Sequence, residues 1–250
     1  MNRKLRRYFL ILIFLCTGAF LALDGIRIIQ GIPIPLIPGD PSRLLKRAVS
    51  LLALLLVWTA GPDAWERTDS RRMRALFLLI FAGDLLLLFN LNRAGIALFV
   101  LVQILMILRN SRGLADYCIS GSLRQDRLWL TASGAAAAGL WGLLALGLFG
   151  PLTRGRELFV FIQIYIPCIT LSLWVSWLTL KIGHFPRTGA LLIGAGMTCF
   201  FLCDITVGLR MSLTGESARS AATALTWVFY APALTLLALS SYDPKRLVFR

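Results

Sequence analysis

Histidine and acidic residues are scarce in this chain of 250 residues, which has one His and 12 Asp and Glu against 26 Lys and Arg. A metal site needs several His, Cys or carboxylate ligands, and the single His184 lies in a connecting segment. Four of the five cysteines fall in apolar stretches, where Cys behaves as a small hydrophobic residue. We therefore expect neither a metal site nor a disulfide framework.

Strand-like alternation of apolar and polar residues is also missing, which argues against a β-barrel. Instead 58% of the residues are hydrophobic, and the mean hydropathy is +0.76. Stretches approaching the roughly 20 apolar residues that cross a bilayer recur along the chain. They predict eight helices, at about residues 8–23, 45–60, 74–90, 95–108, 128–149, 158–180, 189–209 and 221–241. We expect an all-α, multi-pass membrane protein with a single transmembrane domain over residues 1–250.

Two of the predicted spans, the second and the fourth, are short. Short spans cross the bilayer by tilting less or by thinning it, and the alternative is a re-entrant segment that turns back within the membrane. The sequence leaves both possibilities open.

The net charge of +14 could indicate nucleic-acid binding, but the placement of the charges favours another explanation. With the N-terminus inside, about two thirds of the Lys and Arg fall in cytoplasmic segments, which is the positive-inside pattern of membrane proteins. We therefore expect both termini in the cytoplasm and no nucleic-acid partner.

Two aspartates, Asp84 and Asp204, lie well inside predicted spans. A charge at the centre of a membrane helix costs roughly 2.5–3.5 kcal/mol on insertion scales, so such residues usually face a polar cavity or a partner. Both aspartates are expected at similar depth in the outer half of the membrane. A pair of carboxylates with different proton affinities suits acid–base catalysis or a proton relay. The alternative is a structural role, in which each carboxylate bonds to a neighbouring Lys, Tyr or Ser.

Other polar residues are expected near the same membrane half. Arg43, Lys46 and Arg47 open the second span, where they either reach lipid headgroups or hold the phosphate of a substrate. Gln103 is suited to a hydrogen bond between helices, and Gln163 lies near the outer end of the sixth span.

Several short motifs, in order and spacing, resemble the YhhN-type lysoplasmalogenase family of membrane hydrolases. They are Ala82-Gly-Asp84-Leu-Leu-Leu, the span Gly95–Arg109, the F-x-x-x-D block ending at Asp204, and Tyr230-x-x-Ala-x-x-Leu-Leu-Ala-Leu-Ser240. The chain departs from the family pattern at Gln103, where His is frequent, and at Cys203, which replaces Ser. It also has Leu234 where Gln is common.

The resemblance implies hydrolysis of the vinyl-ether bond of a lysoplasmalogen-type lysophospholipid, with no cofactor. Asp84 and Asp204 would be the catalytic pair, with one protonating the enol ether and the other stabilising the cation and activating water. Substrate binding would involve Tyr230, Lys46 and Arg43, with Gln103 and Gln163 nearby. The expected partners are membrane lipids, and the expected location is a bacterial cytoplasmic membrane.

Two alternatives remain open beside the hydrolase. A proton-coupled transporter would need a pathway that reaches both membrane faces, and the inner halves of the spans are poor in polar residues. A lipid-binding or structural relative without activity would explain the altered positions Gln103, Cys203 and Leu234.

Overall fold

The computed structural model describes residues 3–34, 39–89, 91–119, 126–153 and 159–247, and of Arg3 and Pro62 it describes the backbone only. Within these ranges the chain is helical and carries no β-strand, with one isolated bridge between Ala64 and Tyr242. This confirms the predicted all-α class. The long helices are α1 (Arg3–Ile29), α2 (Pro41–Thr59), α3 (Arg67–Leu88), α4 (Asn92–Asn110), α7 (Arg127–Gly142), α9 (Phe159–Ile182), α10 (Arg187–Ser212) and α11 (Glu216–Leu239).

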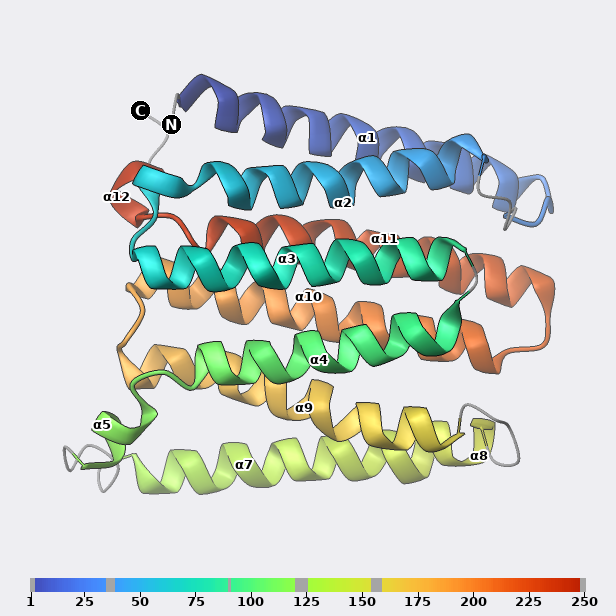
Figure 1. Ribbon diagram of the computed structural model, residues 1–250. Helices are drawn as coiled ribbons and strands as arrows, with labels where there is room; N and C mark the ends of the chain where they lie inside the picture. Colours follow the sequence, from blue (N-terminus) through green and yellow to red (C-terminus); the bar gives the residue numbers. More distant parts are fainter. Residues whose placement is uncertain (1–2, 35–38, 90, 120–125, 154–158, 248–250) are drawn as a thin grey trace.

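Shorter elements join or extend these helices. They are η1 (Gly61–Asp63), α5 (Leu114–Ile119), the π-helix η2 (Leu143–Phe149), α8 (Gly150–Thr153) and α12 (Pro244–Leu247). The long helices run side by side along one direction, and α1 begins at the same end of the bundle as α12 (Figure 1).

Six of the helical segments are long and apolar enough to cross a membrane: α1, α4, the continuous stretch Arg127–Thr153, α9, α10 and α11. The other two long helices, α2 and α3, lack a stretch of that length with as little charge, because several charged residues lie in their first turns and α3 also carries Asp84 near its end. Both short predicted spans, α2 and α4, are unbroken helices of 19 residues that run along the bundle, so neither is re-entrant (Figure 1). The chain is a multi-pass membrane protein.

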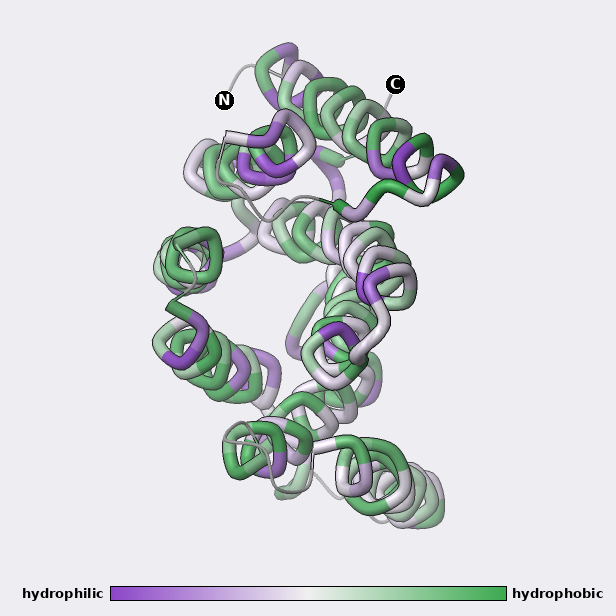
Figure 2. Tube along the Cα trace, turned by 90° about the vertical axis from the view of Figure 1, so that its right-hand side faces the viewer, coloured by the Kyte–Doolittle hydropathy of each residue, from purple (hydrophilic) through white to green (hydrophobic). Residues whose placement is uncertain are grey.

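Six helices form a closed ring, in the order α2, α3, α4, α9, α10 and α11, with α11 packing back on α2. Outside this ring α1 packs on α2 and α11, while α7 packs on α9 (Figure 2). The two outer helices belong to the least buried of the candidate spans, and they expose large apolar side chains such as Phe14 of α1 and Leu128 of α7. Apolar surface of this kind suits contact with lipid.

The π-helix η2 continues α7 and packs against α9 of the ring. Phe149, at its last position, is 2% exposed and packs against Gly208 of α10 so closely that a Cβ there would lie 2.6 Å from its Cε1 atom. A larger residue at position 208 would displace the ring of Phe149. This glycine therefore allows an aromatic side chain from outside the ring to reach its interior.

Candidate functional site

A cavity lies inside the ring, in the half where α2, α9 and α11 begin and α3 and α10 end. It contains about 130 Å³ of space that water could occupy, which is enough for several water molecules. Its lining combines apolar side chains, among them Phe99, Ile166 and Phe200, with polar residues. The polar lining comprises Arg43, Lys46, Arg47, Asp84, Tyr165, Asp204, Arg210, Thr223, Thr226 and Tyr230.

Asp84 of α3 is 3% exposed and receives donors from two other ring helices. Its Oδ2 atom accepts hydrogen bonds from Ser50 of α2 (2.5 Å) and from the Tyr230 hydroxyl of α11 (3.1 Å). Its Oδ1 atom lies 3.2 Å from Nη1 of Arg47, also on α2. Asp84 is therefore a carboxylate with its own counter-ion.

Asp204 of α10 has a different environment, because its donors among the described residues are neutral. The Tyr165 hydroxyl of α9 donates to Oδ2 at 2.8 Å, and the Gln103 amide of α4 donates to the same oxygen at 3.1 Å. Together the two carboxylates draw polar partners from the four other helices of the ring, α2, α4, α9 and α11. No hydrogen bond joins Asp84 to Asp204 among the described residues, so each has a separate set of donors.

The first turns of α2 hold the cations at the cavity. Asp40 caps this helix by accepting from the Ser42 and Arg43 amides, and it pairs with Arg27 at 2.6 Å, which lowers the pKa of the Asp40 carboxyl. Lys46 pairs with Asp24 at 2.5 Å, and both side chains are buried. The positive charge of Lys46 is therefore balanced within the protein.

Arg43 and Arg210 also line the cavity, and Arg210 makes no ion pair among the described contacts. Arg43 is 8% exposed, and Arg210 lies in the last turn of α10. Together with Arg47 they place three guanidinium groups on the lining, where α2 begins and α10 ends. A cluster of guanidinium groups beside a cavity favours an anionic ligand, because such groups bind phosphate strongly.

Five of the seven residues named from the sequence line this one cavity: Asp84, Asp204, Tyr230, Lys46 and Arg43. Gln103 lies behind the lining, where its amide holds Asp204. Gln163 is turned elsewhere, because its amide donates to the Ala145 carbonyl of the π-helix at 3.2 Å.

The sequence placed Arg47 beside Arg43 and Lys46, but it did not single out Ser50, Tyr165 or Arg210 as site residues. A signal existed for Ser50: Arg43, Lys46, Arg47 and Ser50 follow one another at intervals that place them on one face of α2. Tyr165 and Arg210 become recognisable only when α9 and α10 pack beside α3 and α4.

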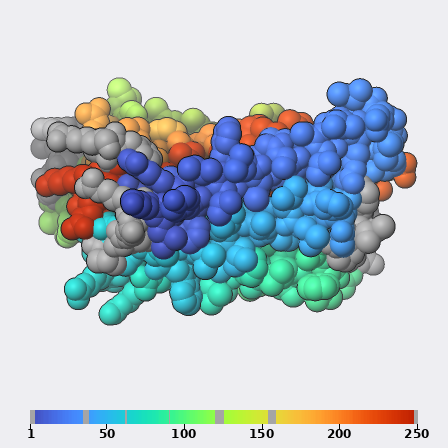
Figure 3. All heavy atoms as spheres, turned by 90° about the horizontal axis from the view of Figure 1, so that it is seen from above, coloured from blue at the N-terminus to red at the C-terminus, as the bar shows by residue number. Residues whose placement is uncertain are grey.

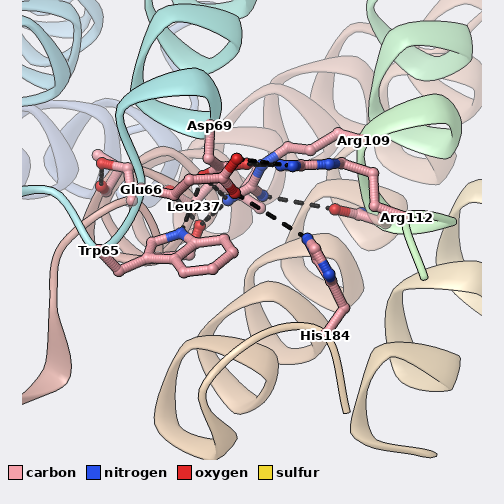
Figure 4. Close-up of polar contacts among 11 residues, drawn as sticks. Trp65, Glu66, Asp69, Arg109, Arg112, His184 and Leu237 are labelled. Atoms are coloured by element: carbon pink, nitrogen blue, oxygen red, sulfur yellow. Dashed lines mark hydrogen bonds and ion pairs between the residues drawn. The ribbon is translucent and has the colours of Figure 1, made fainter. Parts of the chain in front are cut away.

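A second polar cluster occupies the opposite end of the ring (Figure 4). Arg109 binds Asp69 through two hydrogen bonds of 2.8 Å, and the Trp65 indole donates to the same carboxylate. Asp69 is fully buried and Arg109 is 1% exposed. The third predicted span starts only at about residue 74, but helix α3 begins at Arg67 and so carries Asp69 into the bundle.

Around this pair lies a more accessible layer. Arg112 binds Glu66 at 2.7 Å, and His184 lies 4.0 Å from the same carboxylate. The Arg112 hydrogen bond lowers the pKa of Glu66 below its ordinary value of 4.5. Among the described residues no group of three or more His, Cys, Asp or Glu is placed to hold a metal ion.

Comparison with known proteins gives one positive result. No curated protein and no solved structure gives a significant match. The family model for the YhhN family matches residues 42–241, a range that contains every ring helix apart from the first residue of α2. The chain belongs to the YhhN family.

Proposed function

We propose that this protein hydrolyses the vinyl-ether bond of a lysolipid that carries a phosphate headgroup, as a lysoplasmalogen does. The observation that carries the proposal is the meeting of Asp84 and Asp204 on one cavity that is apolar over much of its lining and cationic at one end. An apolar lining suits the alkenyl chain, and the arginines suit the phosphate. The chemistry needs an acid and a base, which the two carboxylates supply.

The surroundings of the two aspartates favour different roles. Asp204, with neutral donors only, is the better acid, because no counter-ion in its described contacts holds it ionised. Asp84 beside Arg47 is the better anion. Tyr230 and Ser50 position Asp84, and Tyr165 and Gln103 position Asp204.

In the proposed reaction Asp204 gives its proton to the alkenyl carbon two bonds from the ether oxygen. This leaves an oxocarbenium ion, which the Asp84 carboxylate stabilises. Asp84 takes a proton from a water molecule as the oxygen of that water bonds to the cationic carbon. As the resulting hemiacetal breaks its bond to the glycerol oxygen, its hydroxyl proton passes to Asp204, and Asp84 gives the proton it took from water to the glycerol oxygen. The products are a fatty aldehyde and a glycerophospho-headgroup, and both carboxyl groups return to their starting states.

Two features bear on the alternatives. A transporter needs a route through the ring, and the Asp69–Arg109 cluster fills the end opposite the cavity. Lipid binding without turnover would use the same cavity and the same arginines, so measured activity must separate it from hydrolysis.

We place the Asp69–Arg109 end in the cytoplasm, in accordance with the distribution of Lys and Arg.

The test is aldehyde release from 1-alkenyl-glycerophosphoethanolamine by the purified protein in detergent. Asp84→Asn and Asp204→Asn are each expected to lower the rate by about 10²–10⁴-fold, the usual contribution of a general acid or base. Asp126→Asn, at the far end of the bundle, is the matched control and is expected to keep the wild-type rate.

Thermal unfolding of each variant shows whether it is folded. Full activity in a folded Asp204→Asn variant would overturn the assigned acid. Saturable lysolipid binding by a wild type that releases no aldehyde would support the lipid-binding relative instead.

A further inference from the structure

A second hollow lies at the start of α3, at the end of the bundle opposite the carboxylate cavity. Its lining consists of Gly61, Arg67, Ser70, Arg71 and Arg74. Side chains from the first turns of α3 (turquoise) project from the molecule at the end where α1 begins (Figure 3). The proposed hydrolysis makes no use of this region.

The three arginines of the hollow have the spacing i, i+4 and i+7, which places them on one face of α3. None of the three has an acidic partner among the described residues. Neighbouring arginines at the same end differ, because Arg112 pairs with Glu66 and Arg246 pairs with Asp63. The hollow therefore gathers positive charge that the described part of the protein does not neutralise.

Ser70 gives an independent indication of a ligand. Its side chain is 3% exposed and lines the hollow, yet its Oγ atom has no hydrogen-bond partner among the described residues. Many helical Ser and Thr residues of this chain donate to a carbonyl one turn earlier, as Ser176 does to Ser172 and Ser212 does to Gly208. A buried hydroxyl without a partner costs about 1–3 kcal/mol, so an acceptor from a ligand would relieve a real penalty.

The remaining geometry suits an anion as well. The Nε atom of Arg74 is also buried without a partner, and its guanidinium lies over Gly61, with Nη2 3.6 Å from the position of a Cβ there. The hollow lies in the first turns of α3, whose N-cap residue Glu66 makes no side-chain capping bond. The positive end of the helix dipole therefore adds to the three guanidinium charges.

We propose that Arg67, Ser70, Arg71 and Arg74 bind the phosphate group of a phosphate ester. Guanidinium groups donate in pairs to phosphate oxygens, and the Ser70 hydroxyl supplies a further donor. The ester is either an anionic phospholipid headgroup at this membrane surface or a small soluble phosphate ester. Both sources offer the same recognised group.

Titration calorimetry on the full-length protein in dodecyl maltoside tests the proposal with two probes, dihexanoyl phosphatidylglycerol and glycerol 3-phosphate. The double variant Arg71→Gln/Arg74→Gln is expected to weaken binding by at least 10-fold, and Ser70→Ala by several-fold. Arg72→Gln is the matched control, because Arg72 is an exposed arginine between the two that does not line the hollow. It is expected to bind as the wild type does.

Binding of the lipid alone would identify a headgroup site, and binding of glycerol 3-phosphate would identify a site for soluble esters. Either result supports the proposal if binding is weakened by the substitutions at Ser70, Arg71 and Arg74 and not by Arg72→Gln. Equal losses in Arg72→Gln and the double variant would show non-specific charge attraction and overturn it. Failure of both probes to bind the wild type would overturn it as well. Aldehyde release plays no part in this readout, so the result is independent of the proposed hydrolysis.

Discussion

Carboxylates are buried at both ends of this bundle, but their surroundings differ. Asp69 receives two hydrogen bonds from Arg109 and one from the Trp65 indole, and it lines no described cavity. Asp84 is also buried and Asp204 is partly buried, yet each lines a cavity that a ligand could enter. Burial of a carboxylate is therefore a poor guide to chemistry by itself. Asp84 and Asp204 differ from Asp69 because each lines a cavity, on the side of the carboxylate that its protein partners leave uncovered.

The comparison is tested most strongly by removing the charge of Asp69. Asp69→Asn leaves Arg109 buried without its counter-ion, which typically costs about 3–5 kcal/mol. We expect a large drop in the thermal unfolding midpoint, with the activity of each folded molecule retained. Asp126→Asn removes half of an exposed pair with Lys181 and is expected to leave the midpoint unchanged. An unchanged midpoint in Asp69→Asn would contradict a structural role for this pair.

Removing a cation at the cavity should produce a smaller effect of a different kind. Arg210→Gln deletes a guanidinium that faces the proposed phosphate position, and a hydrogen bond to a charged group contributes about 1.5–3 kcal/mol. We expect KM for the lysolipid to rise roughly 10–100-fold while kcat changes little. The exposed Arg219, which does not line the cavity, provides the control Arg219→Gln. A fall in kcat with constant KM would place Arg210 in the chemistry rather than in binding.

The smallest effect on stability is expected from a substitution of Glu66, which lies in the accessible layer around Asp69. Arg112 holds the pKa of Glu66 below 4.5, so this pair stabilises the folded state above pH 4.5. The stabilisation is lost as the pH falls through the lowered pKa. Glu66→Gln should therefore unfold at a lower temperature than the wild type at pH 7, and the difference should shrink in acid. A difference that stays constant from pH 7 to pH 3 would show that ionisation of Glu66 is not its source.

Hydropathy predicted the helices well, because membrane helices must bury their own backbone polar groups and therefore appear as long apolar stretches. It also found Asp84 and Asp204, since a carboxylate is conspicuous inside such a stretch. The same method missed Asp69, which lies beside several charged residues in sequence. Its burial depends on Arg109 of α4, a residue 40 positions away.

Gln163 and Tyr165 show a second limit of the sequence. Both lie near the start of α9 and both carry polar groups, so hydropathy treats them alike. Tyr165 faces the cavity and bonds to Asp204, whereas Gln163 bonds to the π-helix. Their direction depends on how α9 is rotated between α4, α7 and α10, and the nearly uniform apolar character of α9 does not encode that rotation.

The sequence by itself determined that this is a helical membrane protein, that it resembles the YhhN family, and that two aspartates lie inside its spans. Only the tertiary structure decided that Arg47 pairs with Asp84, that Asp204 has neutral donors, and that α2 and α11 close a ring around both. The physical reason is the range of the interactions. Hydropathy acts along a single helix, whereas the partner of a buried charge is chosen by the packing of helices that are distant in sequence.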